Sequence, residues 1–114
     1  MQSKSIVNRK DNEMSYSELE MKVVQWGEAR RIVQNSTPAA QWKKTLEEVM
    51  ELRDAIDAGD VDAMKDAYGD ILVTLIMGCA TADIDLVSCL ELAYNEIKNR
   101  KGYLTKEGIF VKEV

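Results

Sequence analysis

Apolar residues recur every three or four positions through most of the chain, which predicts amphipathic helices rather than strands. A first helix is predicted from about residue 16 to about residue 35, because the capping-box pair Ser15 and Glu18 precedes an apolar face. A second helix is predicted to begin at Pro38, a favourable first helical position, and to end at Gly59, which suits a left-handed C-terminal cap.

The third predicted helix starts at Asp60 or Asp62 and continues towards Ala82. Its second half, residues 71–82, carries no charge. This run is too short to span a bilayer, so it predicts a helix that is buried on nearly all sides. The other helices of so small a bundle can cover only part of such a surface, and the uncovered part would be an exposed apolar patch. We therefore expect a homo-oligomer, a dimer or tetramer, that buries this helix at its interface. The alternative is a monomer in which the C-terminal tail folds over that surface.

The fourth predicted helix continues to about Lys101 and stops at Gly102, where a C-terminal glycine is favourable. The expected organisation is a flexible polar leader (residues 1–14), a helical domain (residues 15–102) and a C-terminal tail (residues 103–114) that packs on the bundle. The tail itself is compatible with a short hairpin or an extended segment. Four helices joined by short loops predict an all-α fold, an antiparallel four-helix bundle.

Composition narrows the possible functions of this small domain. The 114 residues carry a net charge of −5, which argues against a non-specific nucleic-acid or membrane-surface protein. The absence of histidine excludes His-dependent triads and His-ligated zinc sites. The cysteines, Cys79 and Cys89, lie in apolar stretches and favour two reduced thiols over a disulfide. We expect a cytoplasmic protein without a nucleic-acid or membrane partner.

Three carboxylates crowd one face of the second predicted helix. Glu47, Glu48 and Glu51 lie within about 100° of arc, and like charges at this spacing oppose helix formation. A divalent cation would remove the repulsion, and ligands that are all oxygen select Mg²⁺, Mn²⁺ or Ca²⁺. The alternative is a solvated acidic helix face.

A fourth acid, Asp70, stands where the charged half of the third predicted helix meets its apolar run. A carboxylate that enters a bundle core must be ion-paired, hydrogen-bonded or metal-bound. Asp66 lies one turn earlier on nearly the same side. These residues predict that two acidic faces converge on one cation or cation pair. The alternative is a salt bridge from Asp70 to Lys44 or Lys65.

Cations and aromatic residues supply the other ingredients of a nucleotide site. Cations near metal-binding acids are typical of phosphate sites. The alternative for the cations at a helix C-terminus is that they only stabilise the helix through its dipole. Trp26 and Trp42 are candidates for stacking on a base, and packing in the core or an interface is the alternative. The candidate cations are Lys44, Lys98, Arg100 and Lys101.

Three stretches together resemble the all-α nucleoside triphosphate pyrophosphohydrolases, the MazG-like group. They are residues 44–52, 69–75 and 93–102, which contain Glu-Glu-x-x-Glu, Gly-Asp and Asn-x-x-Lys in that order. The resemblance covers roughly residues 16–112. It implies an all-helical, oligomeric, Mg²⁺-dependent enzyme that converts an NTP or dNTP and water to the monophosphate and pyrophosphate. The oxygen ligands would also accept Mn²⁺ as a substitute.

The resemblance implies that Glu48, Glu51 and Asp70 are metal ligands. One position departs from the pattern, because the usual second element of the family is Glu-x-x-Asp and Ala67 occupies the place of its glutamate. Asp66 is adjacent and becomes the candidate for the fourth ligand.

The remaining roles also follow from the resemblance. Glu47 matches the carboxylate that either orients the attacking water or takes its proton. Without histidine, a carboxylate is the plausible side-chain base of this cluster. The residues that match phosphate-binding positions are Lys44, Asn95, Lys98 and one of Arg100 or Lys101.

Two other classes of function compete with the enzyme. An acidic helix face could serve a non-catalytic interaction or regulatory module that binds a basic partner. A structural Ca²⁺-binding bundle is less favoured, because no loop has the ligand spacing of a Ca²⁺ site.

Overall fold

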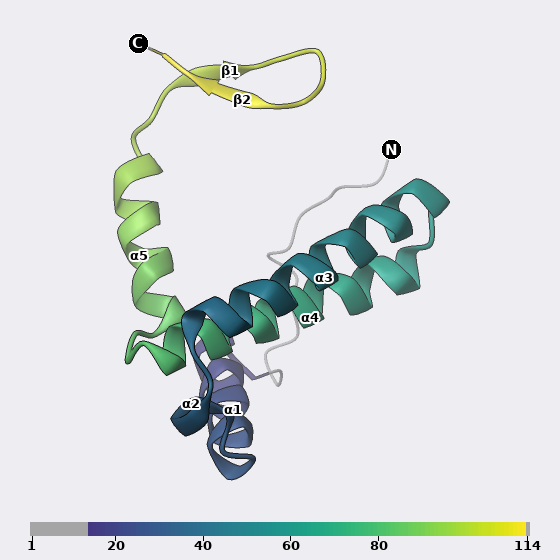
Figure 1. The fold of residues 1–114 in the computed structure, drawn as a ribbon. Helices are drawn as coiled ribbons and strands as arrows, with labels where there is room; N and C mark the ends of the chain where they lie inside the picture. The colour runs from purple at the N-terminus through teal and green to yellow at the C-terminus, as the bar shows by residue number, and fades with distance from the viewer. Residues whose placement is uncertain (1–13, 114) are drawn as a thin grey trace.

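The computed structural model describes residues 14–113, and helices account for most of them, as expected for an all-α protein. The predicted leader lies outside the described residues except for Met14. The elements are α1 (Tyr16–Ala29), α2 (Ile32–Asn35), α3 (Pro38–Ala58), α4 (Val61–Thr81), α5 (Leu86–Ile97), β1 (Gly102–Leu104) and β2 (Phe110–Lys112), shown in Figure 1.

The body of the molecule is an antiparallel pair, α3 and α4, which lie side by side along their length (Figure 1). Local signals define the ends of both helices. The Thr37 side chain accepts a hydrogen bond from the backbone at the start of α3, Gly59 ends α3 at φ 65°, and the Asp60 carboxylate caps α4. A buried hydrogen bond of 2.8 Å from Thr45 to Thr74 fixes how the two helices are aligned.

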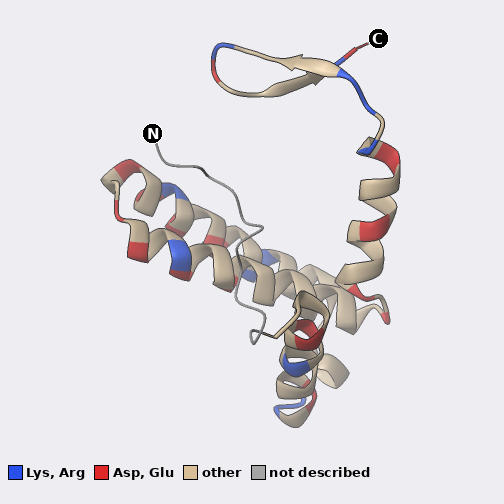
Figure 2. Ribbon diagram, turned by 180° about the vertical axis from the view of Figure 1, so that it is seen from behind, with Lys and Arg blue, Asp and Glu red and all other residues tan. Residues whose placement is uncertain are grey.

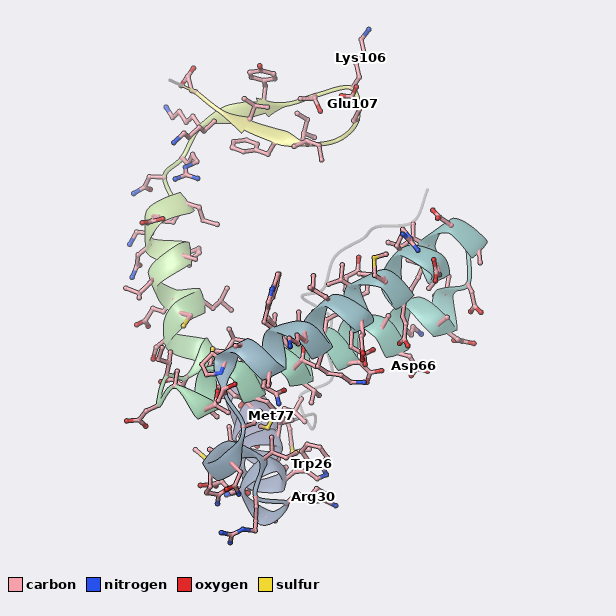
Figure 3. The ribbon with its side chains drawn as sticks, viewed as in Figure 1. Trp26, Arg30, Asp66, Met77, Lys106 and Glu107 are labelled. Atoms are coloured by element: carbon pink, nitrogen blue, oxygen red, sulfur yellow. The ribbon has the colours of Figure 1, made fainter. Side chains whose placement is uncertain are left out.

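The prediction of one continuous first helix is wrong, because the chain breaks between α1 and α2. Arg31 adopts a left-handed conformation with φ 62°, which an α-helix cannot contain. The break turns α2 back towards α4. Before the break, the C-terminal part of α1 packs closely on α4. A Cβ atom at Gly27 would collide with the side chain of Met77, which is almost fully buried. Figure 3 shows Met77 at this crossing.

The C-terminal third of the structure turns away from the α3–α4 pair. The axis of α5 makes an angle of 103° with that of α4. The buried Glu20 carboxylate holds the start of α5, since it accepts hydrogen bonds from the Val87 N–H (3.1 Å) and the Tyr16 hydroxyl (3.3 Å). We call the segment from α5 through β2 the arm.

The fourth helix is shorter than predicted, and the tail is a hairpin. The helix ends at Ile97 rather than near Lys101, because the Arg100 N–H donates to the Ile97 carbonyl (2.8 Å) and the chain turns there. The strands β1 and β2 pair antiparallel, which is one of the two forms expected for the tail. The hairpin does not pack on the helices among the described residues and stands away from them (Figure 1).

The described residues of one copy do not form a closed antiparallel four-helix bundle. Large apolar side chains remain exposed on α4, including Leu72 and Leu75, and on α5, including Leu90 and Leu92. Among residues 14–113, the uncharged run of α4 is therefore only partly covered. In the described part of the chain, no single helix is long and apolar enough to cross a membrane, and α4 with α5 meets that criterion only as a bent pair.

Candidate metal centre

Three carboxylates from two helices meet at the middle of the α3–α4 pair. One oxygen atom from each of Glu48, Glu51 and Asp70 lies within 4.8 Å of the other two. Glu48 and Glu51 share a face of α3 because they are three residues apart. The helix alignment set by Thr45 and Thr74 brings Asp70, one turn before Thr74, opposite this face. We call these three residues the carboxylate centre.

Glu48 is the buried member of the centre. Its residue is only 7% exposed, and its buried Oε2 atom has no hydrogen-bond partner among the described residues. Burial, followed by the nearby Glu51 carboxylate, raises the pKa of Glu48, while Lys44 at 3.6 Å opposes this change. An unpartnered buried carboxylate oxygen is costly, and a cation is the partner that would remove the cost. The donor set contains only oxygen, which suits Mg²⁺ or Mn²⁺.

Glu47 faces solvent beside the centre, with a side chain that is 67% exposed. Lys44 is 3.0 Å from the Glu47 Oε2 atom, and the hydrogen bond with Glu47 is the main cause that raises the pKa of Lys44. Lys44 therefore bridges Glu47 and Glu48 within one chain. This arrangement places a solvent-exposed carboxylate next to a buried one on successive residues of α3.

Asp66 does not join the carboxylate centre in this structure. It is exposed on α4, one turn before Asp70 (Figure 3). Ala67, which takes the place of the family's glutamate, is 3% exposed and packs in the body of the molecule. A glutamate side chain at that position would have to displace its neighbours. The described centre therefore consists of three acids.

A cavity of about 420 Å³ opens next to Asp70, between α1 and α4. Trp26 forms part of its wall, and the Arg30 guanidinium lies 4.8 Å from the centroid of the indole ring. Trp42 is 58% exposed and does not line this cavity. Sequence reasoning missed Lys22 here, although its spacing of four residues from Trp26 indicates the same helix face. The lining residues are Leu19, Lys22, Val23, Trp26, Asp70 and Val73.

The predicted phosphate-binding residues of the last helix lie apart from the carboxylate centre. Asp70 is eleven residues before the end of α4, and the twelve residues of α5 follow after the turn of 103°. At 1.5 Å per residue, the C-terminal end of α5 is on the order of 20 Å from Asp70, too far for a lysine or arginine side chain to bridge. Figure 2 shows these cations at the far end of α5. They are Lys98, Arg100 and Lys101, with Asn95 hydrogen-bonded to Lys98 at 3.3 Å.

Comparison with known proteins assigns the chain to a family. The model of the MazG nucleotide pyrophosphohydrolase domain matches residues 36–104, more than half of the chain. A protein of Haemophilus phage HP1 (strain HP1c1), described as "Uncharacterized 18.2 kDa protein in rep-hol intergenic region", is 35% identical over 65 residues. The alignment covers 57% of this chain and 40% of the phage protein, so the chain spans less than half the length of that relative. No solved structure matches the chain significantly.

Proposed function

Because the chain belongs to the MazG nucleotide pyrophosphohydrolase family, we propose that it hydrolyses a nucleoside or deoxynucleoside triphosphate to the monophosphate and pyrophosphate with Mg²⁺. Glu48, Glu51 and Asp70 would hold the metal. The observation that carries this proposal is the buried Glu48 Oε2 atom, which has no hydrogen-bond partner among residues 14–113 and lies close to two further carboxylates. Mn²⁺ would fit the same oxygen ligands.

The reaction requires a water molecule to attack the α-phosphorus in line with the leaving pyrophosphate. Bound Mg²⁺ would supply charge neutralisation on the phosphate oxygens. Glu47 has the accessibility needed to orient this water or take its proton, and Lys44 at 3.0 Å holds its carboxylate in place. The cavity between α1 and α4 also borders Asp70. Its wall contains Trp26, whose indole ring would provide an apolar surface for the base of the nucleotide.

We propose that a second copy of the chain supplies the cations that contact the phosphates of the nucleotide. Within one chain the cationic end of α5 is too far from the carboxylate centre to reach it, and in the described part of the chain large apolar side chains of α4 and α5 are exposed. A homodimer, or a tetramer built from it, would bury these faces and bring the partner's arm to the centre. Asn95, Lys98 and one of Arg100 or Lys101 would then contact the phosphates of a nucleotide bound to the other copy.

We expect the purified protein with Mg²⁺ to release pyrophosphate and a nucleoside monophosphate from at least one nucleoside triphosphate. The measurement is a panel of ribo- and deoxyribonucleotides, with pyrophosphate and orthophosphate assayed separately. Attack at the α-phosphorus yields no orthophosphate. Release of orthophosphate and a diphosphate, or no turnover with any nucleotide at millimolar Mg²⁺, would contradict the proposed reaction.

The Mg²⁺ requirement should distinguish the two acids of α4. We expect Asp70→Asn to raise the Mg²⁺ concentration for half-maximal activity at least tenfold, equivalent to about 1.4 kcal/mol. Asp66→Asn should change it less than about threefold, because Asp66 lies outside the carboxylate centre and Mg²⁺ readily keeps water ligands. Titration of activity against Mg²⁺ measures both values. Equal increases in the two variants would make Asp66 the fourth ligand.

A further inference from the structure

Cations gather at the junction between α5 and the hairpin, although the protein as a whole is acidic. Residues 98–112 contain five lysines or arginines and one acid, in a chain whose net charge is −5. Arg100 and Lys101 lie at the exit of α5, and Lys112 comes from β2. Lys112 lies outside the part of the chain that the family model matches.

The backbone holds β2 against the exit of α5. Gly102 is the register partner of Lys112, and the Glu113 N–H donates to the Lys101 carbonyl at 2.8 Å. A Cβ atom at Gly102 would collide with the carbonyl oxygen of Val111. Only glycine therefore permits this close approach of the two strands. The position of Lys112 beside Arg100 and Lys101 is a consequence of the fold.

These cations surround an open hollow of about 640 Å³. None of Arg100, Lys101 and Lys112 has an ion-pair partner within 4.0 Å in the described part of the chain. Two acids also border the hollow, so its lining carries one excess positive charge, and an asparagine adds an uncharged donor. The lining residues are Glu96, Asn99, Arg100, Lys101, Lys112 and Glu113.

We propose that Lys112 is a further phosphate-binding residue, which the hairpin adds to the cations that the proposed function already assigns to the end of α5, and that the polyphosphate group of the nucleotide or the pyrophosphate product lies in this hollow. The inference rests on the proposed function and adds that the hairpin contributes a residue to phosphate binding. Arginine offers a fork of donors to phosphate oxygens, while lysine acts as a compact positive charge. Because these three cations form no ion pair with any residue that the structure describes, their charges are available for an anion.

The test compares Lys112→Gln with Lys106→Gln in the full-length protein. Lys106 is also an exposed cation, and it lies at the opposite tip of the hairpin (Figure 3). The probe is inorganic pyrophosphate, titrated calorimetrically without Mg²⁺, so that the carboxylate centre does not contribute. We expect Lys112→Gln to weaken pyrophosphate binding about tenfold, as for loss of one charge-assisted contact, and Lys106→Gln to change it less than twofold. Equal weakening in the two variants would indicate a general charge effect and overturn the inference.

Gly102→Ala provides a second variant that moves β2 without removing a charge. We expect it to weaken pyrophosphate binding as Lys112→Gln does. Wild-type binding of pyrophosphate without hydrolysis of any nucleotide would reject the proposed function and leave this site standing. If the wild-type protein hydrolyses nucleotides and Lys112→Gln keeps the wild-type affinity for pyrophosphate and the wild-type KM, the proposed phosphate site at the hollow is rejected, while the proposed function is retained. An oligonucleotide that binds the hollow more tightly than pyrophosphate would also reject it, since its phosphates come from a nucleic-acid backbone.

Discussion

Glutamine in place of Glu48 is expected to lower nucleotide hydrolysis about 100-fold or more, because it removes a ligand of a metal whose charge contributes several kcal/mol to such reactions. The same substitution should make the metal-free protein more stable. Glu48 is buried beside Glu51, and the amide of glutamine can donate to that carboxylate. The expected gain is about 1 kcal/mol, the scale of a partly desolvated contact between like charges.

The stability gain should depend on pH with a definite sign. The pKa of Glu48 is raised in the folded protein, so ionisation of this carboxyl destabilises the fold at pH values above that pKa. As the pH falls through the raised pKa, the wild-type carboxyl is protonated and the advantage of Glu48→Gln should shrink. Thermal unfolding in a chelator at several pH values measures the difference.

The control for Glu48→Gln is Asp54→Asn, which removes an exposed carboxylate from the same helix. Asp54 pairs with Arg53 at 3.0 Å and does not belong to the carboxylate centre. The Asp54→Asn variant should retain most of the hydrolytic activity and show no gain in stability over the wild-type protein. A Glu48→Gln protein that remains fully active, or one that unfolds at neutral pH, would remove Glu48 from the proposed metal site.

Mixing two inactive variants is expected to restore activity if one copy of the chain supplies the carboxylates and another supplies the cations. Glu51→Gln disables the carboxylate centre, and Lys98→Gln disables the end of α5. In a heterodimer of the two variants, one composite site contains both substitutions and the other contains neither. Random exchange of equal amounts in a two-fold dimer should therefore restore about a quarter of wild-type activity.

The complementation experiment uses light scattering to verify that subunits have assembled and exchanged. A mass near 12.9 kDa at micromolar concentration would show a monomer and exclude a shared site. An oligomer whose mixed variants stay inactive would show that each site is built from a single chain. Mixing either variant with itself after the same treatment gives the background.

Local sequence signals determined the bounds of α3, the start of α4 and the acids of the candidate site. The caps at Thr37, Gly59 and Asp60 lie where the sequence predicts helix ends, because a cap is decided by a residue and its nearest neighbours. The spacing of Glu48 and Glu51 put both on one helix face for the same reason. The family assignment also rests on such short-range motifs and is confirmed by the matching family model.

Tertiary structure decided how these elements are combined. No local signal predicts the left-handed Arg31 that separates α2 from α1, or the turn of 103° that carries the arm away from the α3–α4 pair. The approach of Lys112 to Lys101 depends on a strand pairing that closes only after the hairpin folds. Helix ends and helix faces depend on residues within a turn or two, whereas these features depend on contacts between distant parts of the chain, which periodicity does not encode.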